Sequence, residues 1–129
     1  MGKRFVTPLD LVTLARRLGK SQDEASLRAA ASLAYYGAFH FAGERLEQLT
    51  ADSPERFQWS GRLKSHKRLR DQWTDRGGDA GRTIGDSLFN GHELRKKADY
   101  DLDIIFTPED KVETFKFVAQ VLLEVRRIR

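Results

Sequence analysis

The stretch that decides the fold is Ser32-Leu33-Ala34-Tyr35-Tyr36-Gly37-Ala38-Phe39-His40. It lies within a longer segment, residues 23–49, where Gly37 and Gly43 are the only helix breakers. Six of the alanines in this segment recur along its length: Ala29, Ala30, Ala31, Ala34, Ala38 and Ala42. Small side chains at a contact let neighbouring helices approach closely. The stretch therefore predicts a helix from about residue 23 to residue 49 at the centre of the packing.

Each of the three prolines follows a hydroxyl residue, in Thr7-Pro8, Ser53-Pro54 and Thr107-Pro108. A Ser or Thr N-cap accepts a hydrogen bond from a helical N–H, and the proline after it has no N–H to leave unpaired. Asp10 and Asp110 fall at third helical positions, where negative charge suits the helix dipole. The prolines therefore predict three helix starts.

A fourth start is predicted at Ser21-Gln22-Asp23-Glu24, a capping box in which Glu24 reaches back to Ser21. The helix before it ends at Gly19, a residue typical of helix ends. Its apolar stripe has helical spacing and consists of Leu11, Leu14, Ala15 and Leu18.

Two further helices are expected at about 59–73 and 82–100, joined by a flexible glycine-rich loop at 76–81. The first of these is basic, with Leu63, Leu69 and Trp73 as its apolar contacts. Only residues 102–106 resemble a strand. The pattern predicts an all-α chain that forms one domain over residues 1–129, without internal repeats.

The last predicted helix, 108–127, is apolar on two sides. One side carries Val112, Phe115, Val118, Leu122 and Val125, and the other carries Phe117, Val121 and Ile128. A helix of this kind is deeply buried or pairs with another chain. It therefore raises the hypothesis of a dimer.

Composition narrows the class of protein. The chain has 129 residues, a formal net charge of +4 and no cysteine, which excludes disulfides, thiolate zinc sites and a cysteine nucleophile. No apolar run approaches the roughly 20 residues that span a bilayer, and residues 1–4 lead into no signal-peptide core. We expect a cytoplasmic protein, no membrane contact, and a polyanionic partner such as a nucleic acid.

The sequence predicts no metal and no cofactor. His40, His66 and His92 are each separated by 25 residues, without the spacing of a helical metal site. Asp99, Asp101 and Asp103 alternate like calcium ligands, but Ile104 stands where the sharp turn of a calcium loop needs glycine.

Two helix faces carry candidate functional residues. Ser32, Tyr36 and His40 are spaced four apart in the first. In the second, His92, Arg95 and Asp99 share one face, and Tyr100 follows directly. The Arg95–Asp99 spacing also suits an ordinary surface ion pair.

Three motifs in this order resemble those of the HEPN domain, a helical family named for its occurrence in higher eukaryotes and prokaryotes and for nucleotide binding. They are Ala34-Tyr35-Tyr36-Gly37-Ala38-Phe39-His40, Ser65-His66-Lys67 and Leu94-Arg95-Lys96-Lys97-Ala98-Asp99-Tyr100-Asp101. The similarity covers about residues 21–125. It is closest to small stand-alone HEPN proteins of bacteria and archaea that carry "AYYAMFH"-like and "LRxxADY" helices.

The resemblance implies an up-and-down bundle of four main helices, here with a short N-terminal helix. It also implies a homodimer whose two chains meet in a basic cleft. Many HEPN proteins are metal-independent ribonucleases that act as toxins or in antiviral defence. Others bind RNA or nucleotides, or are partners of a nucleotidyltransferase antitoxin.

The ribonuclease members use an arginine followed after four to six residues by a histidine. No histidine of this chain has an arginine at those offsets. Arg95 aligns with the family's catalytic arginine, but Tyr100 stands where the histidine could be, and a tyrosine is a poor base at neutral pH.

A first hypothesis is therefore a module that binds RNA or a nucleotide, with Arg95, Lys96 and Lys97 facing phosphate. A basic run extends this surface and comprises Arg62, Lys64, His66, Lys67, Arg68 and Arg70.

A second hypothesis is a ribonuclease with a rearranged catalytic set. Arg95 would hold the phosphate, His92 or His40 would act as base or acid, and Asp99 would orient them, with Tyr100 beside them.

A third hypothesis is a structural module. A buried polar network would then fix the helix register, built from Ser32, Tyr36, His40, Asp99 and Tyr100.

Overall fold

Helix α2 (Glu24–Leu49) is the centre of the fold, because each of the other four α-helices packs against it. The computed structural model describes residues 6–128. The remaining elements are α1 (Pro8–Leu18), the 3₁₀ turn η1 (Gly61–Leu63), α3 (His66–Asp75), α4 (Gly78–Tyr100) and α5 (Pro108–Arg127). The predicted all-α bundle and its central helix are confirmed.

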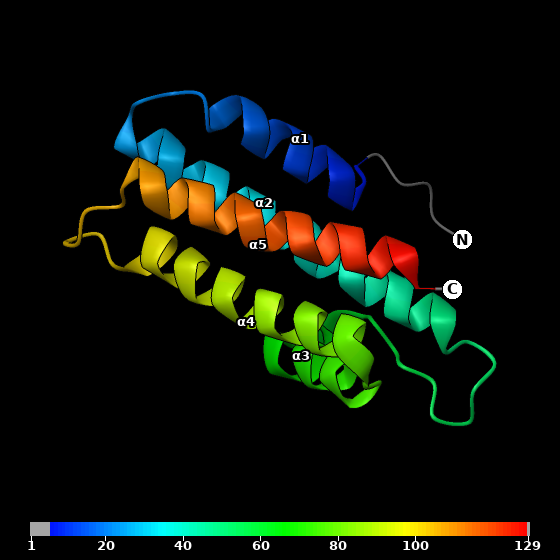
Figure 1. Cartoon of the computed structure of the whole chain (residues 1–129). Coiled ribbons are helices and arrows are strands. Elements are labelled where there is room, and N and C mark those ends of the chain that lie inside the picture. The colour runs from blue at the N-terminus through cyan, green and yellow to red at the C-terminus, as the bar shows by residue number, and fades with distance from the viewer. Residues whose placement is uncertain (1–5, 129) are drawn as a thin grey trace.

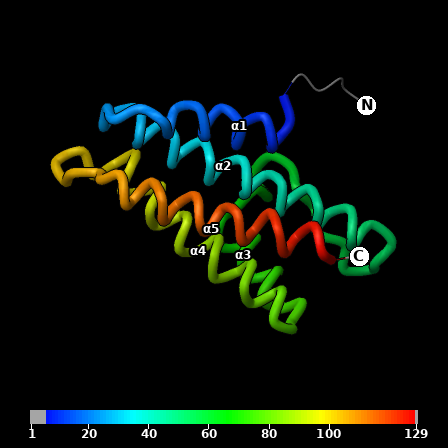
Figure 2. Tube along the Cα trace, turned by 45° about the horizontal axis from the view of Figure 1, so that its top comes forward, coloured from blue at the N-terminus to red at the C-terminus, as the bar shows by residue number. Residues whose placement is uncertain are grey.

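Helices α1, α2, α4 and α5 alternate in direction along the chain. Figure 1 shows α1 and α4 running one way and α2 and α5 running the other. In Figure 2 the same helices lie side by side, with α3 against α4. No helix within residues 6–128 has the length and apolar character needed to cross a membrane. Residues 1–4, which lead into no signal-peptide core in the sequence, lie outside the described residues.

Two of the three predicted proline starts are confirmed. Thr7 and Thr107 each cap a helix, and in both caps an aspartate at the third position returns the hydrogen bond. The third prediction is wrong, because Ser53-Pro54 lies in a turn after α2. The Ser53 hydroxyl there accepts the N–H of Glu55 at 3.1 Å, an alternative local use of the same hydroxyl.

The predicted capping box at Ser21 is also wrong. Asp23 is the N-cap of α2, and its carboxylate accepts the N–H of Ser26 at 3.1 Å. Glu24 turns instead to Arg28 and to the backbone N–H of Phe106. The carboxylate that was expected to close a local box therefore ties α2 to the α4–α5 loop.

Helix α1 is rotated relative to the predicted stripe. Its buried residues are Pro8, Val12 and Ala15, whereas Leu14 is 38% exposed. The cause lies in α2, where Gly37 leaves a hollow that Val12 fills. A Cβ at position 37 would come within 2.5 Å of a Val12 methyl group.

The expected helix at 59–73 is shorter than predicted, because α3 begins only at His66. Trp59 belongs to no helix, and its indole lies over Gly43 of α2. A Cβ at position 43 would approach the Trp59 ring to 2.1 Å. Leu69 and Trp73 are buried as predicted, but Leu63 is exposed.

The predicted flexible loop at 76–81 is a tight turn. Helix α4 begins at Gly78, four residues earlier than expected. Gly77 and Gly78 have φ of +79° and +71°, a conformation that favours glycine. Gly81 lies inside α4, where a Cβ would be 2.5 Å from the Trp73 carbonyl oxygen.

The two apolar sides of α5 are used within the chain, since α5 packs against both α2 and α4. Val118, Val121, Leu122 and Val125 are buried there, while Val112 is exposed. The strand-like pattern at 102–106 forms no strand in the described structure, in agreement with the predicted all-α fold. Those residues form the α4–α5 loop, and of them only Phe106 is buried.

Candidate functional site

Three histidines that are far apart in the sequence converge where α2, α3 and α4 meet. His40 lies on α2, His66 begins α3 and His92 lies on α4. The imidazole rings of His66 and His92 are stacked, with centroids 4.0 Å apart and planes at 6°. The His40 ring lies nearby, with its centroid 5.2 Å from that of Phe39, which in turn stacks on His66 at 4.3 Å.

The floor of this site is aromatic and comes from the stretch that decides the fold. Tyr35 and Phe39 are almost fully buried, whereas His66 and His92 are half-buried above them. The Tyr35 ring stacks on both histidines, with centroids 5.5 Å from each. The Tyr35 hydroxyl lies 2.8 Å from Nδ1 of His66.

Local capping places His66 at this position. Ser65 is the N-cap of α3, and its hydroxyl accepts the N–H of Arg68 at 3.2 Å. The first helical residue after the cap is His66, which faces α4 and meets His92. We name the group formed by Tyr35, Phe39, His66 and His92 the histidine cluster.

Both stacked histidines favour the neutral form. Burial, followed by repulsion from His92, Arg95 and Arg70, lowers the pKa of His66 to about 4. Burial, followed by repulsion from Lys96 and Arg95, also lowers the pKa of His92. The two rings are therefore uncharged at neutral pH and sit in positive potential, a condition that attracts anions.

Burial raises the pKa of Tyr35. Its hydroxyl therefore stays protonated at neutral pH and can donate to Nδ1 of a neutral His66 that carries its ring proton on Nε2.

Arg95 organises a second group of polar residues beside the cluster. Its Nη2 donates to the Tyr36 hydroxyl and, at 3.4 Å, to that of Tyr100. Its Nε lies 2.9 Å from a carboxylate oxygen of Asp99, with the N–H misaligned for a hydrogen bond. Asp99 also accepts from the Ser32 hydroxyl at 3.2 Å. We name these five residues the Arg95 network.

Four of the five residues expected in a structural network thus come together around Arg95. The fifth, His40, has its ring 6.3 Å from that of Tyr36, centroid to centroid. The Arg95–Asp99 pair is not the surface ion pair that its spacing suggested, because the Arg95 side chain is only 10% exposed.

The three consecutive cations at 95–97 do not form one surface. Successive helical residues point about 100° apart. Lys96 pairs with Glu93 at 2.8 Å, whereas Lys97 pairs with Asp110 of α5 at 2.9 Å. Of these three cations, Arg95 and Lys96 act electrostatically on the stacked histidines.

The basic residues in and before α3 also do not form one surface. Arg70 faces α4, with its guanidinium 5.0 Å from the Phe89 ring centre, and its charge acts on both stacked histidines. Lys67 pairs with Asp71 at 2.5 Å on an exposed part of α3. Arg62 and Lys64 are exposed in and after η1.

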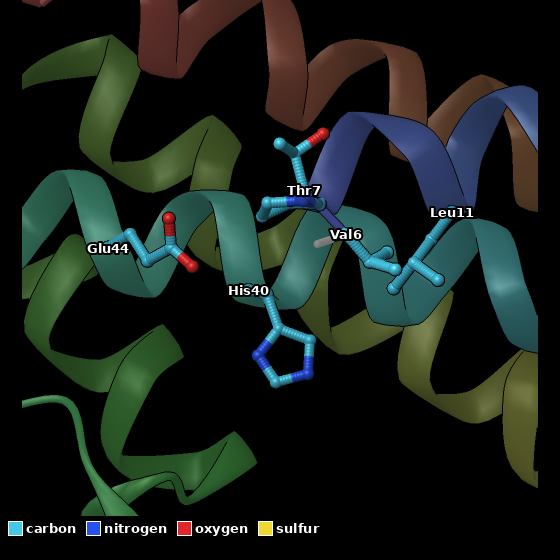
Figure 3. A pocket seen from close by; sticks show the side chains of 6 residues that line it. Val6, Thr7, Leu11, His40 and Glu44 are labelled. Atoms are coloured by element: carbon cyan, nitrogen blue, oxygen red, sulfur yellow. The ribbon is translucent and has the colours of Figure 1, made fainter. Parts of the chain in front are cut away.

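A pocket of about 250 Å³ lies between the start of α1 and α2, with His40 in its lining. It is lined by Val6, Thr7, Pro8, Leu11, His40 and Glu44. Figure 3 shows His40 and Glu44 projecting from α2, while Val6, Thr7 and Leu11 come from α1 and the residues before it. The apolar residues Val6, Pro8 and Leu11 share this lining with the polar residues Thr7, His40 and Glu44.

The sequence pointed to both His92 and His66 as candidate residues, but it did not predict that their rings stack. His66 was placed in a basic run, and Tyr35 received no role. A separation of 25 residues has no helical or strand periodicity, so only the packing of α3 on α4 could reveal the pair. Within residues 6–128, no three His, Asp or Glu side chains are grouped so as to hold a metal ion.

Comparisons with models of protein families, with curated proteins and with solved structures find no match to this chain.

Proposed function

We propose that this chain is a HEPN-like domain that binds RNA or a nucleotide at the histidine cluster. The observation that carries the proposal is the face-to-face pair of His66 and His92 in positive potential. A neutral imidazole carries an N–H group that can donate a hydrogen bond to a phosphate oxygen or to the edge of a base. The charges of Arg70, Arg95 and Lys96 attract the phosphates.

The ligand lies along α2 in this proposal. Phosphate is held between the stacked histidines and the cations of α3 and α4. A base enters the pocket beside His40, where Val6 and Leu11 supply apolar walls. Arg95 contributes charge and holds Tyr36 in place rather than contacting phosphate, because its guanidinium is already engaged.

The resemblance to HEPN proteins extends the proposal to the biological context. The domain acts in the cytoplasm as a homodimer, in a toxin–antitoxin or defence system, with a nucleotidyltransferase-type antitoxin as partner. Light scattering at micromolar concentration tests the dimer, and a monomeric mass would contradict that part.

Binding of a fluorescent single-stranded RNA tests the central proposal. Affinity should fall steeply between about 50 and 300 mM salt, since phosphate contacts release counterions. Arg70→Ala and Lys96→Ala should each weaken binding by about tenfold at low salt. Lys116→Ala, an exposed change on α5, is the matched control and should bind like the wild type. Equal binding by all variants would contradict the site.

A second candidate function is metal-independent RNA cleavage, favoured by the presence of two imidazoles in one site. One neutral histidine would take the proton of a 2′-hydroxyl as its oxygen attacks the phosphorus. The other, protonated once phosphate raises its pKa, would give a proton to the leaving 5′-oxygen. The products would be a 2′,3′-cyclic phosphate and a 5′-hydroxyl.

Incubation of total RNA or tRNA with the protein in EDTA separates the two functions. Cleavage that is lost in both His66→Ala and His92→Ala supports the ribonuclease. Cleavage that persists in folded preparations of both variants contradicts it. Salt-sensitive binding without any cleavage leaves the binding module.

A further inference from the structure

The end of the bundle where α4 joins α5 carries an exposed apolar surface with an excess of carboxylates. Five of the ten exposed large apolar side chains in the described part of the chain fall within residues 100–112. They are Tyr100, Leu102, Ile104, Ile105 and Val112. Figure 1 shows the loop between α4 and α5 projecting at this end. Clustered apolar exposure of this kind marks interaction surfaces.

The same segment is strongly acidic. Residues 99–113 contain six carboxylates and one lysine, a net charge of −5, in a chain whose net charge is +4. Two of the carboxylates, Asp99 and Asp110, are engaged with Arg95 and Lys97. The other four are exposed and are Asp101, Asp103, Glu109 and Glu113. We name these four, with the five apolar residues above, the acidic apolar patch.

The loop that presents the patch is held firmly in place. The buried Arg28 guanidinium donates to four backbone carbonyls around the loop, those of Lys97, Ala98, Asp101 and Ile104. Phe106 is 1% exposed, and its N–H donates to the Glu24 carboxylate at 3.2 Å. The outward direction of Leu102 and Ile105 is therefore built into the fold, and a preorganised surface binds at lower entropic cost.

The start of α5 adds a hollow to this surface. A depression of about 320 Å³ is lined by Pro108, Glu109, Val112 and Glu113. It combines an apolar floor with two carboxylates, and it can receive an apolar side chain that has a cation next to it.

We infer that the acidic apolar patch docks a cationic amphipathic segment of another protein, such as a helix with leucine-like residues on one face and lysine or arginine beside them. Charge selects this occupant. RNA and anionic lipid are repelled by the patch, so its ligand differs from that of the histidine cluster. A symmetric contact between two copies would set the same carboxylates against each other.

The inference does not rest on the proposed function, since the patch and the histidine cluster share no residue. The probe is a helical peptide of about 14 residues built from leucine and lysine, with leucines at i, i+3, i+4 and i+7. Its binding to the full chain is measured by fluorescence anisotropy. A matched peptide with glutamate in place of lysine tests charge, and one with glutamine in place of leucine tests apolar contact.

We expect the leucine–lysine peptide to bind and the other two to bind at least about tenfold more weakly. The variant Leu102→Ser/Ile105→Ser should weaken binding by about tenfold, as should Asp103→Asn/Glu113→Gln at low salt. The matched controls are Leu123→Ser on α5 and Asp52→Asn/Glu55→Gln after α2, which are exposed elsewhere and should bind like the wild type.

Three results would overturn the inference. The first is equal affinity of the patch variants and the wild type, and the second is equal binding of the glutamate peptide. The third is self-association of the chain that is lost in Leu102→Ser/Ile105→Ser, because a second copy would then be the occupant. Circular dichroism of each variant shows that it is folded before binding is compared.

Discussion

The imidazole rings of His66 and His92 lie face to face, with centroids 4.0 Å apart and planes within 6° of parallel. The pair joins the first residue of α3 to the middle of α4, over the buried Tyr35. Stacking at this distance is compatible with neutral rings, whereas two imidazolium ions would repel each other. The protonation state of the two rings therefore affects both the stability of the bundle and the attraction of the site for phosphate.

The first prediction concerns pH. Both histidines have a pKa below the ordinary value of 6.5 in the folded state, and that of His66 is about 4. Between pH 4 and pH 6.5 the unfolded chain therefore binds more protons than the folded chain. The contribution of the two histidines to stability is complete above about pH 6.5 and decreases as the pH falls toward 4. The Tm should fall by several degrees over this range. In His66→Phe, which cannot titrate, the fall should be smaller; an unchanged pH slope would contradict the assignment.

The second prediction concerns the buried ion pair. Asp99→Asn removes the countercharge of Arg95, whose side chain is 10% exposed, and should lower the free energy of unfolding by about 2 kcal/mol. Urea denaturation measures the change. In the Asp99→Asn background, Arg95→Met should lower the free energy of unfolding by less than it does in the wild type. In the wild type the substitution leaves the Asp99 carboxylate unpaired, whereas in the Asp99→Asn background no carboxylate is present. The exposed Arg82–Asp79 pair is the control, and Asp79→Asn should cost less than about 0.5 kcal/mol.

The third prediction concerns the α4–α5 loop. Arg28→Met removes donors to four carbonyls and should lower the free energy of unfolding by about 3 kcal/mol. Proteolysis of the folded protein should then begin within residues 101–107, as read by mass spectrometry. Arg17→Met, at an exposed position of α1, should leave the cleavage pattern unchanged. Cleavage of the Arg28 variant elsewhere first would count against a role of Arg28 in holding the loop.

The fourth prediction concerns the contact between α2 and Trp59. Gly43→Ala would bring a Cβ to within 2.1 Å of the indole and should cost about 2–3 kcal/mol, although alanine favours helices. Thermal or urea unfolding measures the cost. In a Trp59→Leu background, Gly43→Ala should lower the free energy of unfolding by less, because the smaller leucine side chain leaves room for the added Cβ. Equal costs in the two backgrounds would show that the clash is not with Trp59.

Much of the fold could be predicted from local signals. The Thr7 and Thr107 caps, the bounds of α5 and the central position of α2 all follow from capping chemistry and small residues. The helix start predicted at Ser53-Pro54 was wrong because the same dipeptide also suits a turn. The segment after it has no regular secondary structure, and its Phe57 and Trp59 are buried against the bundle. The Gly77-Gly78 pair was expected to be flexible, whereas its positive φ angles make the tight turn into α4.

The candidate site was predictable only in part. Helical spacing placed His92, Arg95 and Asp99 on one face, and the Arg95–Asp99 contact is present. The stack of His66 on His92 depends on how α3 packs against α4, which no local pattern encodes. The sequence also did not predict which basic side chains are exposed. Lys97 pairs with Asp110, and Arg95 is buried between Tyr36 and Tyr100.

The most direct test of RNA or nucleotide binding at the histidine cluster uses the imidazole resonances. An untagged chain has three histidines, so the NMR signals of His40, His66 and His92 can each be assigned by single substitutions. Titration with a short single-stranded RNA should shift the signals of His66 and His92 saturably and raise both pKa values, because a phosphate stabilises the protonated rings. RNA that binds without moving either signal, or that does not bind at low salt, would contradict the account.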